Sequence, residues 1–186
     1  MAGLPADGAV WCVRSMAMGG RGASMGPSRT SKAAMYRKIL VPVDGSATAA
    51  RGLEEATALA RTSGAQLVLL HVVDAYPLAV EMATADTWQL LMDGLRQQGQ
   101  ALLAQGSAAA RAHGVPAVER LVEFPAGRVS DAILDEARLS DCDLIVMGTH
   151  GRRGFAHMML GSDAERVVHE SRLPVLLVRH PEAPKR

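Results

Sequence analysis

The stretch DLIVMGTHGRRGFAHMMLGSDAERVVHESRLPVLLV, residues 143–178, contains one complete unit of an α/β fold. It starts with the apolar run LIVM, continues through a loop that holds four glycines, and shows helical spacing before a second apolar run, PVLLV. Continuous apolar runs of this length are typical of strands that are buried on both faces of a parallel sheet. The stretch therefore predicts a strand, a loop, a helix and a strand.

The same alternation of strands and helices extends back to Arg37. It predicts an α/β fold with an open, doubly wound, five-stranded parallel sheet in the order 3-2-1-4-5 and helices on both faces. Segment 117–124 alternates polar and apolar residues, so we expect it at an edge. Three glycines within 84–113 disfavour that helix by ~1 kcal/mol each. The expected strands are 38–43, 66–73, 117–124, 142–147 and 174–178; the expected helices are 46–63, 84–113, 129–140 and 162–172.

Composition narrows the class of protein. The chain is 48% hydrophobic and 21% charged, which is ordinary for a soluble globular protein. A formal net charge of +1 gives no general attraction to nucleic acid or to an anionic membrane, and no apolar run approaches the ~18 residues of a membrane span. Cys12 and Cys142 form neither a CxxC pair nor a metal-ligand spacing. We therefore expect a cytoplasmic protein that binds neither nucleic acid nor membrane.

The chain changes character near Met35. Residues 1–34 are rich in Gly, Ser and Ala and show no helical or strand period, which predicts a disordered extension. A targeting peptide, or a start codon placed upstream of a natural beginning at Met35, are the alternatives. The expected organisation is one folded domain over residues 35–182, followed by a short tail, 183–186.

The unusual polar residues follow two of the expected strands. Asp44-Gly45-Ser46 follows the first strand, and Gly148-x2-Gly151 follows the fourth. In an open α/β sheet, ligands bind outside the carboxyl ends of the strands, where the strand order reverses. Asp44 and Gly148 are therefore expected to face one crevice. Glycines at 148, 151 and 154 would allow positive φ angles and the close approach of a ligand.

The end of the glycine loop indicates an anion site. Ser162 is the expected N-cap of the next helix, whose free N–H groups and dipole favour an anion. His150 and Arg152 add positive charge, so the anion is expected to be a phosphate. Asp44 suits ribose hydroxyls, an adenine amine or a divalent cation. Taken singly, each of these residues could serve only a turn or a helix cap.

Several enzyme signatures are absent from the sequence: the P-loop, a GxGxxG after the first strand, a GxSxG elbow and a His/Cys metal cluster. Asp44 has no evident partner that would make it a general base, so no catalytic residue is predicted. His71 lies inside an apolar strand and is expected to be a core histidine. Arg153 and His157 are expected to be solvated loop residues.

Four segments resemble the universal stress protein family: MYRKILVPVDGS, LVLLHVVD, DLIVMGTHGRRGF and LGSDAERVVHESRLPVLLVR. The spacing Gly148-x2-Gly151-x9-Gly161-Ser162 is similar to the glycine motif of the family's ATP-binding branch. The resemblance covers residues 35–182. It implies an adenine-nucleotide alpha-hydrolase-like fold and a homodimer joined through the last strand, Pro174–Arg179. It also implies ATP, with ADP or AMP as alternatives, and Mg²⁺ or Mn²⁺ with the phosphates.

Carried over residue by residue, the resemblance places Asp44, with its two preceding residues, and Val72 at the adenosine. It places Met147 and Gly148 along the ribose and phosphates. With His150 and Gly154 from the loop itself, the predicted ATP-binding residues are Pro42, Val43, Asp44, Val72, Met147, Gly148, His150, Gly151, Arg152, Gly154, Gly161 and Ser162. No metal ligand is predicted beyond Asp44 or the nucleotide's own phosphates.

The resemblance implies an ATP-dependent regulator of stress response or survival that acts through partner proteins. The alternatives are a slow ATPase, a protein that phosphorylates itself with Ser162 as the acceptor, and a scaffold with a vestigial site. A nucleotidyl transferase is disfavoured because HIGH-type and SGGxDS-type signatures are absent. The chain departs from the family pattern in its leader and at Asp163, where a small or apolar residue is common.

Overall fold

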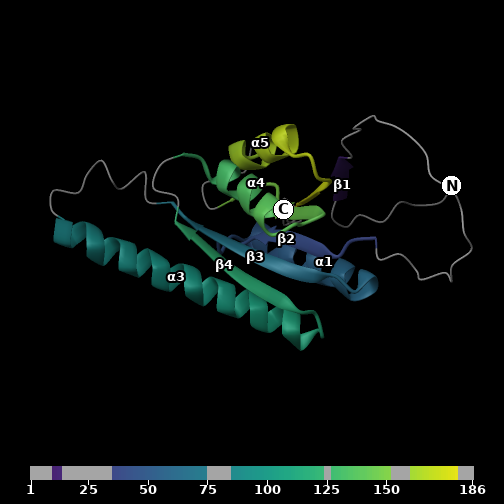
Figure 1. Ribbon diagram of the computed structural model, residues 1–186, viewed down its shortest axis with the longest axis horizontal. Helices are drawn as coiled ribbons and strands as arrows, with labels where there is room; N and C mark the ends of the chain where they lie inside the picture. Colours follow the sequence, from purple (N-terminus) through teal and green to yellow (C-terminus); the bar gives the residue numbers. More distant parts are fainter. Residues whose placement is uncertain (1–9, 14–34, 75–84, 124–126, 152–159, 180–186) are drawn as a thin grey trace, which may run out of the picture.

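A computed structural model of the chain describes residues 10–13, 35–74, 85–123, 127–151 and 160–179 (Figure 1). The predicted tail, 183–186, and most of the leader lie outside these residues. The described elements, in chain order, are β1 (Val10–Val13), β2 (Lys38–Pro42), α1 (Ala47–Ser63), β3 (Gln66–Val73), α3 (Ala85–Ala112), β4 (Ala117–Glu123), α4 (Val129–Leu139), β5 (Leu144–Gly148), α5 (Ser162–Glu170) and β6 (Val175–Val178).

The strands form one sheet in the order β1-β6-β5-β2-β3-β4. The neighbours from β6 to β4 are parallel, and in chain order these five strands have the predicted order 3-2-1-4-5. The doubly wound α/β fold is therefore confirmed. Strand β4 lies at one edge of the sheet, as its alternating sequence predicted.

Helices cover both faces of the sheet (Figure 1). Alternation along β2 explains why its sequence is continuously apolar: Ile39 and Val41 join the core beneath α1 and α3, whereas Leu40 joins the core beneath α4 and α5. All three side chains are fully buried. Among the described helices, none combines the length and apolar character needed to cross a bilayer.

The prediction for the leader is wrong at Val10–Val13. These residues form β1, which pairs antiparallel with β6 in the register Val10↔Val178 to Val13↔Val175. The physical reason is that β6 would otherwise be the outer strand of the sheet, with unpaired backbone groups that a short apolar segment can satisfy. Four residues are too few to show a period in the sequence, so the strand was not foreseen.

Helix α3 is continuous although it contains three glycines, and two of them have a packing reason. A methyl group at Gly99 would lie 2.5 Å from Cδ2 of His71, and one at Gly106 would lie 3.2 Å from the side chains of Leu53 and Leu69. At Gly94, no described residue lies within 4 Å of the same position. Glycine therefore lets α3 pack closely on the sheet at two of the three positions, which offsets its poor helix propensity.

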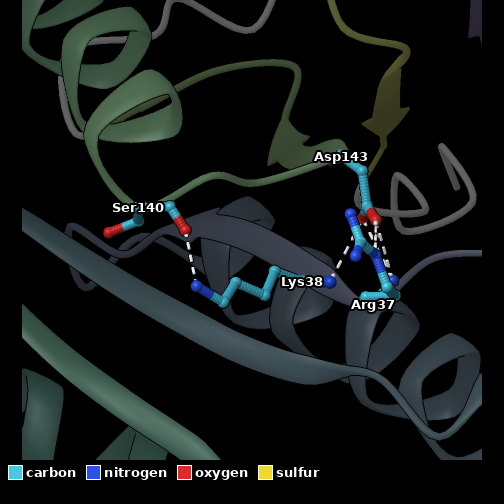
Figure 2. Close-up of polar contacts among 4 residues, drawn as sticks. All are labelled: Arg37, Lys38, Ser140 and Asp143. Carbon is cyan, nitrogen blue, oxygen red and sulfur yellow. Dashed lines mark hydrogen bonds and ion pairs between the residues drawn. The ribbon is translucent and has the colours of Figure 1, made fainter.

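The amino ends of β2 and β5 are joined by polar contacts (Figure 2). The Asp143 carboxylate accepts hydrogen bonds from the backbone N–H groups of Arg37, at 2.9 Å, and Lys38, at 3.1 Å. The Lys38 ammonium donates to the carbonyl oxygen of Ser140 at 2.9 Å. Next to this network, burial raises the pKa of the Cys142 thiol to about 11, which fits its predicted role as a small hydrophobic residue.

Candidate functional site

A cavity of about 290 Å³ lies at the carboxyl ends of β2, β3 and β5, beside the first turns of α4 and α5. Its position is the one expected for a ligand site in an open α/β sheet, because β2 and β5 are the neighbours between which the strand order reverses. Ten of the residues predicted from the sequence line this cavity: Pro42, Val43, Asp44, Val72, Met147, Gly148, His150, Gly151, Gly161 and Ser162.

Asp44 is held at the cavity by the turn that follows β2. Its Oδ1 accepts a hydrogen bond from the backbone N–H of Ser46 at 2.9 Å. Gly45 adopts a φ of 83°, a conformation that glycine reaches at little cost. Ser46 is then the N-cap of α1, with Oγ accepting from the N–H of Ala49. The Asp-Gly-Ser sequence therefore does cap a helix, and it also places a carboxylate on the cavity wall.

The chain leaves β5 in direct contact with the first turn of α1. A methyl group at Gly148 would lie 2.8 Å from the carbonyl carbon of Thr48. The Thr48 hydroxyl donates a short hydrogen bond to the carbonyl oxygen of His150, and the backbone N–H of Gly161 donates to the carbonyl oxygen of Thr149 at 2.8 Å. Both ends of the loop that contains the glycine motif are thus anchored to the framework around the cavity.

Gly151 brings the two distant sequence motifs together. A methyl group at this residue would lie 2.8 Å from Oδ2 of Asp44 and, among the described residues, within 4 Å of no other group than that carboxyl. The backbone at Gly151 therefore passes directly beside the carboxylate that follows β2. Asp44 and the glycine loop face one cavity, as the expected strand order required.

Positive φ, one of the two reasons expected for these glycines, is wrong for Gly148 and Gly151. Among the described residues, the glycines with positive φ are Gly45, Gly64, Gly114 and Gly127. Gly148 and Gly151 are instead positions where a neighbouring group, the Thr48 backbone or the Asp44 carboxylate, occupies the space that a Cβ would need. Close approach, rather than an unusual backbone conformation, accounts for glycine at both positions.

The cap of α5 also differs from the prediction. The N-cap residue is Gly161, with a φ of −72°, and Ser162 is the first residue of the helix. Ser162 lines the cavity. Glycine is also accepted at N-caps, so Ser162 is not needed as the cap and lies on the cavity wall at the helix N-terminus.

One carboxylate of the cavity wall was not among the predicted site residues. Asp74, which follows β3 as Asp44 follows β2, lines the cavity. Its place after a buried strand was the available signal. The departure at Asp163 is explained by a contact between helices: its Oδ1 accepts from the backbone N–H of Ser130, at the start of α4, at 3.3 Å. The remaining lining residues are Ala49, Leu70, Val129, Ile133, Thr149 and Ala164.

His71 is a core histidine, as predicted. It is buried, and its Nδ1 donates to the carbonyl oxygen of Val43 at 2.7 Å. This bond fixes the last residue before Asp44. Arg152 and Gly154 are predicted site residues that lie outside the described residues, and the same is true of Arg153 and His157.

The arrangement suits a ligand with a flat apolar part and a polar part. Buried Leu70, Val72 and Met147 offer apolar walls. Carboxylates accept hydrogen bonds from hydroxyl or amino groups, while the N-terminus of α5 favours a negatively charged group. Among the described residues, no group of three or more His, Cys, Asp or Glu side chains is arranged to hold a metal ion.

Comparison with known proteins agrees with this geometry. Residues 35–179 match the model of the universal stress protein family. Universal stress protein MJ0531 of Methanocaldococcus jannaschii is 33% identical over 148 residues, which cover 80% of this chain and 85% of that protein. The family match, residues 35–179, contains every described residue of the cavity wall.

Solved structures show the same architecture. The structure of protein MJ0577 of Methanocaldococcus jannaschii matches with a TM-score of 0.70 and 28% identity, covering 80% of this chain and 99% of that one. A universal stress protein solved in complex with cAMP matches with a TM-score of 0.56 and 26% identity, covering 77% and 97% of the two chains. A protein of this fold and family therefore binds an adenine nucleotide.

Proposed function

Because the chain belongs to the universal stress protein family, we propose that it binds an adenine nucleotide, ATP, in the cavity between the ends of β2 and β5. The observation that carries the proposal is the meeting of Asp44 with Gly151 on one cavity wall. Two motifs that lie a hundred residues apart form a single polar surface beside apolar walls, which is typical of a small-molecule site.

The cavity fits such a ligand in chemistry and in size. Its volume of about 290 Å³ is close to the lower end of the ~300–1,000 Å³ range of small-molecule pockets. Val72 and Met147 would contact the base, Asp44 would accept from the ribose hydroxyls, and Gly161 with Ser162 would hold the phosphates. ATP would carry Mg²⁺ or Mn²⁺ on its phosphates, where the metal neutralises charge close to the cavity's carboxylates.

The proposed role is nucleotide-dependent regulation of stress response or survival, in the cytoplasm, through partner proteins. Slow hydrolysis of ATP, or transfer of its γ-phosphate to Ser162, is a second candidate. It is favoured by one observation: Ser162 lines the cavity, while Gly161 and not Ser162 is the N-cap residue of α5. Incubation with Mg²⁺-ATP, followed by mass spectrometry, distinguishes the two, since only the second gives ADP or a Ser162 phosphate that the Ser162→Ala variant lacks.

The proposal is tested by calorimetric titration of the chain with ATP, ADP, AMP, cAMP and GTP, each with and without Mg²⁺. We expect saturable binding of adenine nucleotides, with GTP weaker by at least about tenfold, a difference of 1.4 kcal/mol. Protein purified from cells is first denatured and assayed for nucleotide, because a retained ligand would hide binding. Absence of binding by nucleotide-free protein would contradict the proposal.

A matched pair of variants locates the bound nucleotide. Gly151→Ala places a methyl group against the Asp44 carboxylate, whereas Gly94→Ala makes the same change on α3 where nothing lies within 4 Å. We expect Gly151→Ala to weaken ATP binding and Gly94→Ala to leave it unchanged. Equal affinities in the two variants would place the nucleotide elsewhere.

A further inference from the structure

The two edges of the sheet differ in how they are protected from pairing with another molecule. The outer strand β4 carries Glu119, Arg120 and Glu123, all exposed, and charges on an edge strand oppose the addition of a further strand. Strand β6 has the sequence VLLV and carries no charge. On that side, protection comes from β1 of the same chain.

Strand β1 suits this position in sequence and in direction. Its residues, VWCV, are uncharged, and all four pair with β6, from Val10↔Val178 to Val13↔Val175. The pairing is antiparallel. Two copies of one edge strand that meet across a two-fold axis perpendicular to the sheet are also antiparallel. Strand β1 therefore occupies the backbone groups that β6 of a second copy would need.

We propose that β1 is an intramolecular cap on the β6 edge, which keeps the full chain from joining a second copy through β6. The homodimer expected through Pro174–Arg179 would then form only after β1 is released. This inference does not depend on nucleotide binding, because its residues lie outside the cavity wall.

The competition favours the chain's own strand at ordinary concentrations. Only residues 14–37 separate β1 from β2, and tethers of such length give effective concentrations on the order of 1 mM. For equal intrinsic affinities, a second copy at about 10 µM is therefore outcompeted by roughly 100-fold at the same edge. The cap would be lost by cleavage of the leader, or by a partner that binds Val10–Val13 more tightly than β6 does.

The experiment measures the mass of the full 186-residue chain by light scattering after size exclusion, at about 10 µM. The capped chain is expected at the mass of one copy, 19.6 kDa. The variant Trp11→Pro/Cys12→Pro is expected at twice that mass. Successive N–H groups of a strand point to opposite sides, so prolines at two adjacent positions remove a donor to β6 whichever residue supplies it.

Two controls separate the cap from other effects. Ala23→Pro/Ser24→Pro, between β1 and β2, should leave the mass at one copy. Circular dichroism should show an unchanged fold in both double variants, because all four positions lie outside the family domain, 35–179. A synthetic peptide of residues 8–15, added at millimolar concentration, should return the Trp11→Pro/Cys12→Pro dimer to single chains by refilling the edge.

Three results would overturn the proposal. A wild-type chain that is already dimeric at 10 µM would show that β1 does not prevent association. A Trp11→Pro/Cys12→Pro variant that stays at the mass of one copy would show that the exposed β6 edge does not pair. A dimer of that variant that resists the peptide would be joined at another surface.

Discussion

At the amino ends of β2 and β5, polar groups of one segment bond to polar groups of the other. The Asp143 carboxylate accepts from two backbone N–H groups, and Lys38 reaches the carbonyl of Ser140 (Figure 2). At the carboxyl ends of the same strands, Asp44 and the glycine loop line a cavity of about 290 Å³. The difference teaches that one end of the sheet is closed by polar contacts, whereas the other leaves the cavity in which we propose that the nucleotide binds.

The largest effect on stability is expected at Gly148, where the carboxyl end of β5 packs closely against α1. In Gly148→Ala, the new methyl group would lie 2.8 Å from the carbonyl carbon of Thr48, a backbone atom in the first turn of α1. Overpacking of this kind costs about 1–3 kcal/mol, so we expect a loss of about 3 kcal/mol in the free energy of unfolding. Urea denaturation measures it. A stability equal to that of wild type would mean that α1 can shift away from β5 at little cost.

At the amino end, Asp143→Ala should destabilise the fold without affecting ligand binding. The substitution leaves the N–H groups of Arg37 and Lys38 without their carboxylate acceptor. The expected loss is about 2 kcal/mol, since a hydrogen bond to a charged group contributes ~1.5–3 kcal/mol and these donors are partly solvated. Urea denaturation and ATP titration are compared on the same variant. Weaker ATP binding by this variant would show that the amino end of the sheet also affects the proposed ligand site.

Gly151→Ala should show the opposite pattern. Among the described residues, the methyl group would meet a side chain, the Asp44 carboxyl group, and no backbone atom within 4 Å, so the free energy of unfolding should stay within about 0.5 kcal/mol, as for ordinary surface substitutions. ATP affinity should fall by at least about tenfold, or 1.4 kcal/mol. Calorimetry gives both binding and, by scanning, stability. Unchanged affinity would remove Asp44 and Gly151 from the binding surface.

On α3, Gly94→Ala and Gly99→Ala should differ in sign. Gly94 has open space around it, so alanine should stabilise the helix by ~1 kcal/mol. At Gly99 the methyl group would press on His71, whose Nδ1 holds the carbonyl of Val43 beside the cavity. We expect Gly99→Ala to lower both the unfolding midpoint in urea and the ATP affinity. Stabilisation by both substitutions would show that His71 moves freely.

The smallest effect is expected at the outer strand β4, which belongs to neither of the two compared ends of β2 and β5. The Arg96 guanidinium donates a hydrogen bond to the Glu123 carboxylate at 2.7 Å. This hydrogen bond is the main reason why the pKa of the Glu123 carboxyl group is lowered. The pair therefore stabilises the fold above the carboxyl's unfolded-state pKa, and this stability is lost as the pH falls through the lowered value. Both side chains are partly exposed, so Glu123→Gln should cost only a few tenths of a kcal/mol at pH 7. Urea midpoints of variant and wild type should converge once the pH is below the lowered pKa of Glu123; a difference that persists in acid, where the carboxyl group is protonated, would have another cause.

The sequence allowed the fold to be predicted because its strands are continuous apolar runs that helices separate at short intervals. The edge position of β4 followed from its alternating pattern. Strand β1 could not be foreseen, since four apolar residues gain a partner only once β6 is known to be outermost. The local sequence pattern is enough to predict a strand or helix whose buried residues recur at regular spacing. It is not enough to predict a strand that depends on pairing with a segment distant in the sequence.

The candidate site was predictable to a similar depth. Residues that follow buried strands, such as Asp44 and Gly148, could be placed at one end of the sheet from strand order alone. The hydrogen bond from the Ser130 N–H to the Asp163 carboxylate could not be predicted, because it depends on how α4 and α5 pack. The reason for glycine at Gly148 was also hidden, since the Thr48 backbone that excludes a Cβ is distant in sequence.

The most direct test of a ligand site at the carboxyl end is thermal unfolding with and without Mg²⁺-ATP. Wild type and Asp143→Ala should both gain ~2.7 kcal/mol at 100 times the Kd, which raises the melting temperature by roughly 5–10 °C for a chain of this size. Gly151→Ala, at the same ATP concentration, should gain clearly less. If nucleotide-free wild type shows no shift, or if Gly151→Ala shifts as far as wild type, the cavity between β2 and β5 is not the ATP site.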